Sequence, residues 1–595
     1  MPFRTHTDAL QKLERFFHSL RHSGRDEIFI SLLDKKSAAE QLAEQYERHP
    51  RGRLTGMLIA VKDNIDVVGF DTTAAAPGFA YTPDRDSAVV AQLRSEGALV
   101  VGKTNLDQFA TGLVGTRSPY GAVRDAIVPE RISGGSSSGS AVAVSLGLVD
   151  AALGTDTAGS GRIPAGLQGI VGIKPTIGLV SNDGVVPACA SYDCVTVLAP
   201  DLPIAELVMQ IMAQSGHREL PHDLAMKPPV SPVVGIPTTL PSMSETWVRA
   251  FHAAVMRLEE RGFLIREINL DPSLEAAKML YDSPLVAERA EAVGEFVTAA
   301  GDDDNIDPTV RGIITGATRF SAPEVLEAQR DLATRREAAL REWSACDVIM
   351  VPTAPFHPDI ETVQHDPIGV NAAMGTFTNF CNLFDLCAVA VPAGIVSDGG
   401  SLGSHLPASF GVTFLSTAFR DDIVGAVART FTGPPTPTND PAPGWLAENA
   451  REGDRVVSLA VFGAHLRGQP LNRELLNLGA VYLGNITTTS DYRLFALDTT
   501  PPKPGLTGPL PSGADGQSVD GEEWLLSHDS LARLLTALPE PMTLGSVSLS
   551  DGRSITGFSF QPACLGSARD ITEWGGWRSY LEHSLQQDDI HAPSR

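Results

Sequence analysis

Short apolar runs alternate with longer amphipathic stretches along the chain up to residue 432. The short runs are rich in β-branched residues and flanked by turn residues, which is typical of strands buried on both faces. The longer stretches repeat their apolar positions with the 3.6-residue period of a helix. This alternation predicts an α/β domain whose sheet is covered by helices. The predicted strands are 56–68, 98–102, 169–174, 348–352 and 388–392, and the predicted helices lie within 9–46, 87–97, 245–261 and 323–343.

The pattern changes at a proline-rich stretch, residues 433–444, which predicts a semi-rigid spacer because proline fits neither a helix interior nor a central strand. Beyond it, strands are predicted at 456–464 and 492–497 and in a hairpin around Asp551-Gly552. A second Pro/Gly-rich patch, 499–516, is predicted to be a loop. We therefore expect three parts: an α/β domain (1–432), a Pro-rich linker (433–450) and a smaller α+β domain (451–595).

Composition narrows the function classes. The chain has 595 residues and a net charge of −25, which disfavours binding to nucleic acid or to anionic membranes. No stretch approaches the ~18 apolar residues of a membrane span, and the first residues lack the apolar core of a signal peptide. The six cysteines have irregular spacing and no His cluster beside them, so we expect reduced core residues and no zinc site. A cytoplasmic protein is expected.

Two Ser/Gly stretches, 133–140 and 154–162, are the first candidates for an active site. Glycines let the main chain approach a ligand closely and let consecutive N–H groups converge on an anion. Such composition alone is also typical of a flexible linker. The first stretch, however, runs directly into the apolar segment 141–148, which favours a folded, buried site over a linker.

A serine in such a site needs a base to take its proton. No Gly-x-Ser-x-Gly elbow is found here, but Lys62 lies inside the apolar run 56–68. Burial disfavours the ammonium form and lowers the pKa of a lysine, so that a neutral Lys62 could accept a proton. The alternative is structural: the head of Lys62 would pair with Asp63 or Asp66.

The sequence of residues 56–431 resembles that of the amidase-signature hydrolases. The resemblance is carried by Gly134-Gly-Ser-Ser-Ser-Gly-Ser140 and Gly154-Thr-Asp-Thr-Ala-Gly-Ser-Gly-Arg162. It implies a mixed-sheet core covered by helices and a Ser-cisSer-Lys triad that requires no metal or cofactor. In that triad Ser160 would be the nucleophile, Ser136 the cis-peptide serine that relays the proton, and Lys62 the base.

The same resemblance implies an oxyanion hole made by main-chain N–H groups of Thr157, Ala158 and Gly159, together with that of Ser160. Two positions depart from the common family pattern, because Ser138 and Ala158 stand where glycine is frequent. Neither change removes a group that transfers a proton.

Within this family the chain is most similar to allophanate hydrolases. One basis for this similarity is the segment 111–121, in which Gly112 would contact substrate. Another is Tyr281 with Arg289: on one helix, positions eight apart lie on nearly the same face, so both could address one ligand. Arg289 would bind a carboxylate with its planar guanidinium. The plain alternative is a solvated arginine on a helix surface.

The C-terminal domain, beginning with residues 461–472, also resembles that of allophanate hydrolases, which is similar in fold to γ-glutamylcyclotransferases. His465 near Asn472 could position a small carboxylated product. A lone histidine near a strand is equally compatible with a structural role. Glu522 and Glu523 are the acid/base candidates of this domain, and the sequence does not choose between them.

The resemblance implies hydrolysis of allophanate (urea-1-carboxylate) to ammonia and carbon dioxide, with the C-terminal domain assisting decarboxylation. It leaves open a homodimer and functional coupling to a urea carboxylase. Two alternatives remain: a small-amide amidase of broad specificity, and an amidase-like subunit of an amidotransferase assembly. The residues alone indicate only a serine amidohydrolase with a cationic substrate-binding residue.

Overall fold

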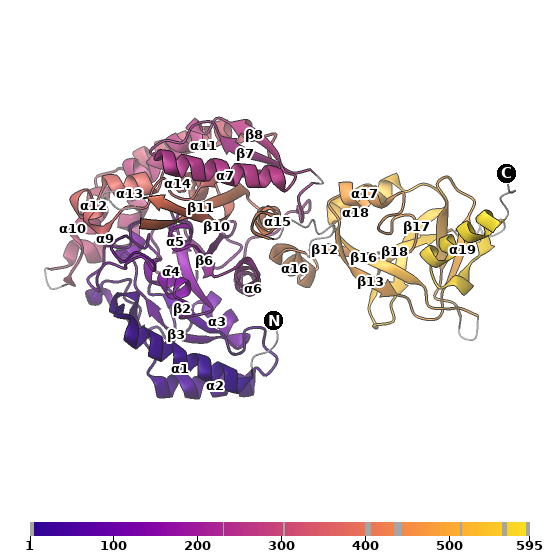
Figure 1. The fold of residues 1–595 in the computed structure, drawn as a ribbon, viewed down its shortest axis with the longest axis horizontal. Helices are drawn as coiled ribbons and strands as arrows, with labels where there is room; N and C mark the ends of the chain where they lie inside the picture. Colours follow the sequence, from indigo (N-terminus) through magenta and orange to yellow (C-terminus); the bar gives the residue numbers. More distant parts are fainter. Residues whose placement is uncertain are drawn as a thin grey trace. The chain divides into compact units, whose positions relative to one another are not determined.

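The computed structural model describes residues 5–229, 231–301, 304–398, 406–433, 443–511, 515–561 and 568–590. The chain forms two compact units, one made of residues 1–219 and 231–435 and the other of 220–230 and 436–595. In Figure 1 the first unit runs from indigo to orange, and residues 436–595 of the second run from orange to yellow. The proline-rich residues 434–442 of the predicted linker lie outside the described residues. No feature of the sequence had indicated that 220–230 belongs with the second unit.

The first unit is built on a mixed sheet. Among the described residues it has eleven strands in the order β1-β3-β2-β4-β6-β5-β10-β11-β9-β7-β8. Neighbours of β2 and of β7 are parallel, whereas the centre of the sheet is antiparallel. The strands in this order are Phe29–Leu32, Leu99–Thr104, Leu58–Lys62, Ala151–Asp156, Cys194–Ala199, Val171–Lys174, Leu386–Asp398, Leu406–Thr417, Val348–Pro352, Val233–Pro237 and Leu264–Ile268. The mixed α/β core expected from the sequence is confirmed.

Helices cover this sheet, and the central strands have no exposed face. Every residue of β2, β3, β4, β5 and β6 is buried, which explains why these strands read as continuous apolar runs instead of alternating ones. The helices of the unit are α1 His6–Ser23, α2 Lys35–Arg48, α3 Ala88–Ser95, α4 Ser138–Ser145, α5 Arg162–Gln168, α6 Leu202–Met212, α7 Glu245–Glu260, α8 Asp271–Asp282, α9 Ala287–Ala299, α10 Pro308–Ala317, α11 Ala322–Glu342, α12 Ile360–His365, α13 Gly369–Met374, α14 Asn379–Leu383 and α15 Asp421–Thr432.

The N-terminal helical region is confirmed as α1 and α2, with the short strand β1 between them. A capping box of Thr5 and Asp8 starts α1, and Asp34 caps α2 by accepting two backbone N–H groups. Leu13 and Phe16 of α1 are buried in a core cluster that includes Phe29 of β1. Strand β1 was not predicted, because a four-residue strand is too short to show a period.

The second unit contains two sheets. One has the order β13 (Val481–Thr487), β16 (Asp520–Ser527), β12 (Val456–Val461), β18 (Ser554–Phe560) and β17 (Met542–Ser548). The other has the order β15 (Lys503–Thr507), β14 (Arg493–Leu497) and β19 (Arg569–Asp570). Its helices are α16 Trp445–Glu452, α17 Asn472–Asn477, α18 His528–Ala537 and α19 Trp577–Ile590. The hairpin around Asp551-Gly552 is confirmed, since β17 and β18 pair antiparallel with Gly552 at a φ of 88°.

Two predictions for this unit are wrong. Residues 445–450, assigned to the linker, belong to α16, because Trp445, Leu446 and Ala450 give that helix a buried face. Residues 503–507, assigned to a loop, form β15, which pairs with β14 despite the prolines around it. The likeness to γ-glutamylcyclotransferases stays a prediction.

Of the helices within the described ranges, none combines the length and the apolar character needed to cross a bilayer. Cys189, Cys194, Cys346, Cys381 and Cys387 are free thiols, and Cys564 lies outside the described residues.

Candidate active site

Lys62 ends the buried strand β2, and its side chain has no exposed surface. Its ammonium nitrogen lies 2.8 Å from Ser136 Oγ and 2.7 Å from Thr155 Oγ1, and donates to both hydroxyls. The parallel pairing of β2 with β4 brings Thr155 to Lys62, since Val61 stands opposite Leu153. The sequence had indicated Lys62 and Ser136 but not the hydroxyl of Thr155.

The environment of Lys62 favours its neutral form. Burial lowers the pKa of the Lys62 ammonium to about 7, although the carboxylates of Asp107, Asp156 and Asp193 oppose this shift. At neutral pH a substantial fraction of Lys62 is therefore an amine that can accept a proton.

The alternative pairing of Lys62 with Asp63 or Asp66 is wrong. Asp63 forms a buried ion pair with Lys103, with 3.3 Å between Nζ and Oδ1. Asp66 accepts hydrogen bonds from Thr72 Oγ1 at 2.7 Å and from the Tyr81 hydroxyl at 2.8 Å. Successive side chains of a strand point to opposite faces, so the neighbour of Lys62 in the sequence faces away from it.

Ser136 lies in the turn before α4, and the linker interpretation of this stretch is wrong. All residues from 133 to 140 are buried. The peptide bond between Gly135 and Ser136 is cis, and Gly134 has a φ of 78°, a value that favours glycine. Within this packed interior the Ser136 hydroxyl lies against Lys62.

Ser160 lies between β4 and α5 and is 2% exposed. The Ser137 N–H donates to the Ser160 carbonyl at 3.4 Å, which ties the two Ser/Gly segments together through their main chains. The segments that carry Lys62, Ser136 and Ser160 thus meet at one end of β2 and β4.

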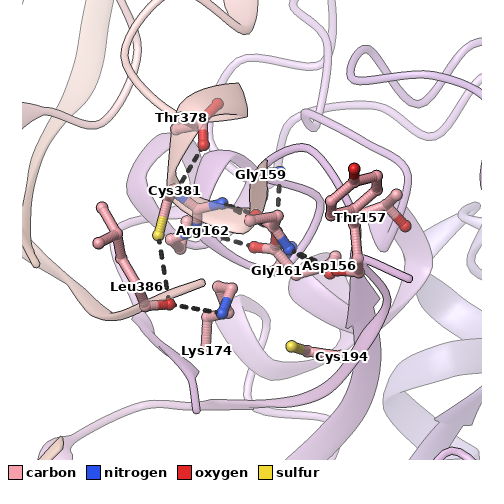
Figure 2. Close-up of polar contacts among 12 residues, drawn as sticks. Asp156, Thr157, Gly159, Gly161, Arg162, Lys174, Cys194, Thr378, Cys381 and Leu386 are labelled. Carbon is pink, nitrogen blue, oxygen red and sulfur yellow. Dashed lines mark hydrogen bonds and ion pairs between the residues drawn. The ribbon is translucent and has the colours of Figure 1, made fainter. Parts of the chain in front are cut away.

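A carboxylate shapes the Ser160 turn from within (Figure 2). Asp156 Oδ1 accepts the Gly159 N–H at 2.8 Å, and Oδ2 accepts the Gly161 N–H at 3.1 Å. Gly159 has a φ of 129°, which makes this tight turn possible without strain only for glycine. Because its N–H is already bound by Asp156, Gly159 is not a free donor for an anion; Thr157 and Ala158 are left from the three predicted positions.

Arg162 holds Asp156 in place. The guanidinium donates to both carboxylate oxygens at 2.9 Å, and further to the Thr378 carbonyl at 3.1 Å and Asn382 Oδ1 at 2.7 Å. Burial alone would raise the pKa of Asp156, but Arg162 holds it below its usual value. Below this pair, Lys174 donates to the Leu386 carbonyl at 2.7 Å (Figure 2). Asp156 and Arg162 were visible in the motif 154–162, but the sequence assigned them no role.

Asp193 supports the other side of the turn. It accepts a short hydrogen bond from Thr157 Oγ1 and a backbone N–H from Ala188 at 2.8 Å. This contact fixes the side chain of Thr157. No sequence pattern had indicated Asp193.

Tyr281 and Arg289 meet, but from two different helices. Tyr281 is on α8 and Arg289 on α9, and the short 3₁₀ helix Pro284–Val286 separates them, so the single-helix prediction is wrong. Arg289 Nη2 donates to the Tyr281 hydroxyl at 3.1 Å, and the guanidinium carbon lies 4.9 Å from the centre of the tyrosine ring. The alternative of a solvated arginine is also wrong, because Arg289 is 1% exposed.

Arg289 reaches the segment predicted to bind substrate. Its Nη1 donates to Thr111 Oγ1 at 2.9 Å, next to Gly112, while its Nε is buried without a hydrogen-bond partner in the described part of the chain. A pocket of about 620 Å³ is lined by Tyr281, Arg117 and residues of α10 and α13. The guanidinium therefore contacts the residue before Gly112, and its partner Tyr281 lines the pocket.

In the second unit, His465 lies against a cavity of about 280 Å³. Its Nε2 is 3.0 Å from Glu474 Oε2, and its ring stacks on Phe558 with 4.6 Å between the ring centres. Burial lowers the pKa of His465, whereas Glu474 acts to raise it. Lys503 lines the same cavity. Glu474 and Lys503 were missed because no motif marks them.

Asn472 supports this site indirectly, since its Nδ2 donates to the His465 carbonyl at 3.0 Å and it does not line the cavity.

Glu522 and Glu523, the acid/base candidates of this domain, do not line the cavity beside His465, and their role stays a prediction. Glu522 is fully buried and accepts from Arg467 and Arg578, the latter at 2.7 Å. Glu523 accepts two hydrogen bonds of 2.9 Å from Arg553. Each of the two carboxylates thus has a guanidinium partner.

The described residues contain no group of three or more His, Cys, Asp or Glu side chains that could hold a metal ion.

Fold and site together define a class of protein, the amide hydrolases that gather serine hydroxyls and a lysine at one end of a mixed sheet. The chain belongs to the amidase family, whose model, described as Amidase, matches residues 27–424. A second model, described as Allophanate hydrolase C-terminal domain, matches residues 457–582.

Known relatives agree with both assignments. The chain is 39% identical to the urea amidolyase of Saccharomyces cerevisiae over 96% of its own length, and it spans about a third (32%) of that protein. It is similar to a Kluyveromyces lactis allophanate hydrolase structure with a TM-score of 0.83 and 37% identity, covering 98% of this chain and 97% of that one. A glutamyl-tRNA(Gln) amidotransferase component from Natronomonas pharaonis is 34% identical over 60% of this chain and 92% of its own length.

Proposed function

We propose that the chain hydrolyses allophanate, cleaving the terminal carboxamide in the first unit and breaking down the resulting N-carboxycarbamate in the second. The observation that carries this proposal is the 2.8 Å hydrogen bond between Lys62 Nζ and Ser136 Oγ inside a fully buried site. A lysine with a pKa of about 7 is matched to proton transfer at neutral pH.

In this proposal Ser160 Oγ attacks the carboxamide carbon. Its proton passes to Ser136 Oγ, while the proton of Ser136 passes to Lys62 Nζ. Returning along the same path, a proton reaches the amide nitrogen, which leaves as ammonia. Water then attacks the acyl-enzyme, with Lys62 again taking the proton through Ser136, and releases N-carboxycarbamate.

The oxyanion formed in each attack needs donors that are fixed before the reaction. The main-chain N–H groups of Thr157, Ala158 and Ser160 are the candidates, since that of Gly159 is bound to Asp156. Removing one donor from such a site typically costs about 2.7–4 kcal/mol. Asp156, Arg162 and Asp193 would contribute by holding this turn rigid.

Substrate choice is assigned to Arg289, with Tyr281 and Gly112 beside it. A buried guanidinium with an uncommitted Nε favours a ligand that carries a carboxylate. Allophanate carries a carboxylate at the end opposite to its carboxamide, so Arg289 would bind one end while Ser160 attacks the other.

In the second unit we assign the next step to the His465 cavity. N-carboxycarbamate retains no carboxamide for Ser160 to attack, so its further breakdown is decarboxylation. Loss of carbon dioxide leaves an electron pair on nitrogen, which takes a proton and gives carbamate; carbamate then yields ammonia and the second carbon dioxide. His465, oriented by Glu474, is the candidate proton donor, and the Lys503 ammonium is a candidate partner for a carboxylate.

The likeness to amidotransferase components keeps one alternative open, but it covers 60% of this chain and leaves out the second unit. A buried guanidinium favours a substrate that carries a carboxylate, so the burial of Arg289 disfavours an amidase for neutral substrates. Because the chain matches about a third of a urea amidolyase, we further propose that its substrate is supplied by a urea carboxylase, in the cytoplasm.

A substrate panel with mass balance tests this function. The purified chain should release ammonia and carbon dioxide from allophanate and should prefer it to neutral amides of the same size. Equal activity on neutral amides would favour the amidase alternative, and no activity without added partner chains would favour the amidotransferase alternative.

A further inference from the structure

Asp107 is a buried carboxylate beside the candidate active site. It follows β3, whose parallel pairing with β2 places Thr104 opposite Lys62, so both acidic and basic groups lie at the same end of the sheet. The side chain of Asp107 has no exposed surface. A carboxylate in such a position requires partners, because burying it without hydrogen bonds is costly.

Its partners belong to the segment next to Arg289. Asp107 Oδ2 accepts the Gly115 N–H at 3.0 Å, and Oδ1 accepts the Arg117 N–H at 2.9 Å. One carboxylate thus binds two main-chain N–H groups at the C-terminal end of the segment 111–117. The Arg117 side chain in turn donates to the Thr111 carbonyl at 2.9 Å.

Two glycines, each in a different segment of the chain, lie close to the Asp107 carboxylate. A methyl group added at Gly112 would lie 2.5 Å from Asp107 Cγ, well inside van der Waals contact. A methyl group added at Gly135 would overlap Asp107 Oδ2. Gly112 belongs to the segment assigned to substrate binding, and Gly135 directly precedes Ser136. Asp107 therefore fills the space between the substrate-binding segment and the serine turn.

Burial lowers the pKa of Lys62, and among the carboxylates that act to raise it Asp107 has the largest effect. The other charged groups that act on Lys62 are Asp156 and Asp193, which raise its pKa, and Arg289, which lowers it. Geometry and charge thus connect Asp107 with the proton-transfer groups as well as with the substrate-binding segment.

We propose that Asp107 is a positioning residue for amide hydrolysis, which holds the 111–117 segment and the Gly135-Ser136 turn in register with each other. This inference rests on the proposed hydrolysis at Lys62, Ser136 and Ser160. It predicts that Asp107 influences both substrate binding and proton transfer without touching the substrate.

Asp107→Asn and Asp107→Ala test the proposal. The Asn variant keeps the shape and one of the two N–H acceptors but removes the charge, so Lys62 loses its main anionic neighbour. We expect the acid limb of the pH profile of kcat/KM to move to lower pH by about half a unit to one unit, and kcat to fall about tenfold. The Ala variant also loses both N–H acceptors, so its KM should rise further as the 111–117 segment loosens.

Asp421→Asn is the matched control. Asp421 is likewise buried and accepts a backbone N–H, from Thr176 at 2.9 Å, but it is not among the charges that act on Lys62. The Asp421→Asn variant should have a lower melting temperature, but the acid limb of its pH profile of kcat/KM should stay at the wild-type pH. If folded Asp107→Asn shows the wild-type pH profile, kcat and KM, the proposal is overturned.

Gly112→Ala keeps the proposal testable if the Asp107 variants do not fold. It pushes a methyl group against the carboxylate and leaves all charges in place, so KM should rise and kcat should fall while the acid limb stays at its wild-type pH. Wild-type kinetics in a folded Gly112→Ala variant would contradict the proposal. All variants are measured on whichever amide the wild type hydrolyses, so a failure here differs from a wild type that leaves allophanate intact.

Discussion

The two candidate sites of this chain use titratable groups in opposite surroundings. Lys62 is fully buried, and the partners of its ammonium are the neutral hydroxyls of Ser136 and Thr155. His465 lies against a cavity and is paired with Glu474, whose side chain is 55% exposed. Burial is the largest influence on the pKa of both groups, but the hydrogen-bond partners of Lys62 are buried hydroxyls, whereas the partner of His465 is a solvent-screened carboxylate.

This difference predicts how each site responds to change. A site set by desolvation and by hydroxyl geometry depends on single atoms, since each donor and acceptor has a fixed place in a packed interior. A site whose histidine is paired with an exposed carboxylate tolerates substitution of that carboxylate better, because water can replace the lost partner. We expect the largest effects in the first unit and smaller ones in the second.

Ser160→Ala should give the largest effect. It deletes the proposed nucleophile while the turn around it, held by Asp156 and Arg162, keeps its hydrogen bonds. The rate of ammonia release should fall by a factor of about 10⁴ or more, with an unchanged melting temperature. Ser138→Ala is the matched control, a buried serine of the same region that should remain close to wild type. More than a trace of activity in Ser160→Ala would exclude this serine as the nucleophile.

The pH dependence of the wild type should give the next largest effect. Below a pKa of about 7, Lys62 gains a proton and can no longer accept one, so kcat/KM should fall about tenfold per pH unit. Near pH 5 it should be about a hundredth of its plateau value. A profile that stays flat from about pH 9 to pH 5 would contradict a neutral-lysine base.

Arg289→Gln should separate charged from neutral substrates. Charge-assisted hydrogen bonds contribute about 1.5–3 kcal/mol, so kcat/KM for allophanate should fall about ten- to a hundredfold, with a smaller loss for an uncharged amide. Arg311→Gln is the control, since Arg311 bonds the Val297 and Ala300 carbonyls at the end of α9 and has no assigned role with substrate. Equal losses on both substrates would make Arg289 a structural residue.

The second unit should respond more weakly. His465→Ala should leave the disappearance of allophanate unchanged, but the second ammonia and the carbon dioxide should lag behind the first ammonia. Glu474→Gln should produce a shorter lag, because His465 keeps its place against Phe558. His583→Ala, in α19, serves as the control and should show no lag. Synchronous product release by His465→Ala would remove this residue from the reaction.

Local pattern predicted five of the eleven described strands of the first unit, namely β2, β3, β5, β9 and β10. Strand β9 has the bounds that its apolar run predicted, because a buried strand has no exposed position to interrupt the run. Lys62 was indicated by its place inside an apolar run, and Ser136 by a Ser/Gly motif that is chemically specific. Thr155 and Asp193 could not be found in this way, because their partners lie far away in the sequence and meet only when the sheet forms.

One error had a cause that the sequence carried. Tyr281 and Arg289 were placed on one helix although Ser283-Pro284 stands between them, and the residue before a proline is biased away from helical geometry. Glu522 and Glu523 were chosen by residue type alone. Their arginine partners come from distant segments, so only the folded sheet shows that both carboxylates are already paired.

The division of labour between the units is tested most directly by mixing two variants, each defective in one unit. Ser160→Ala should not consume allophanate, and His465→Ala should consume it while the second ammonia lags. At an alkaline pH where N-carboxycarbamate is long-lived, addition of Ser160→Ala to His465→Ala should abolish the lag, since the intact second unit of one variant processes the product released by the other. A lag that persists at every ratio of the two variants, with wild-type enzyme abolishing it under the same conditions, would contradict a separate catalytic site at His465.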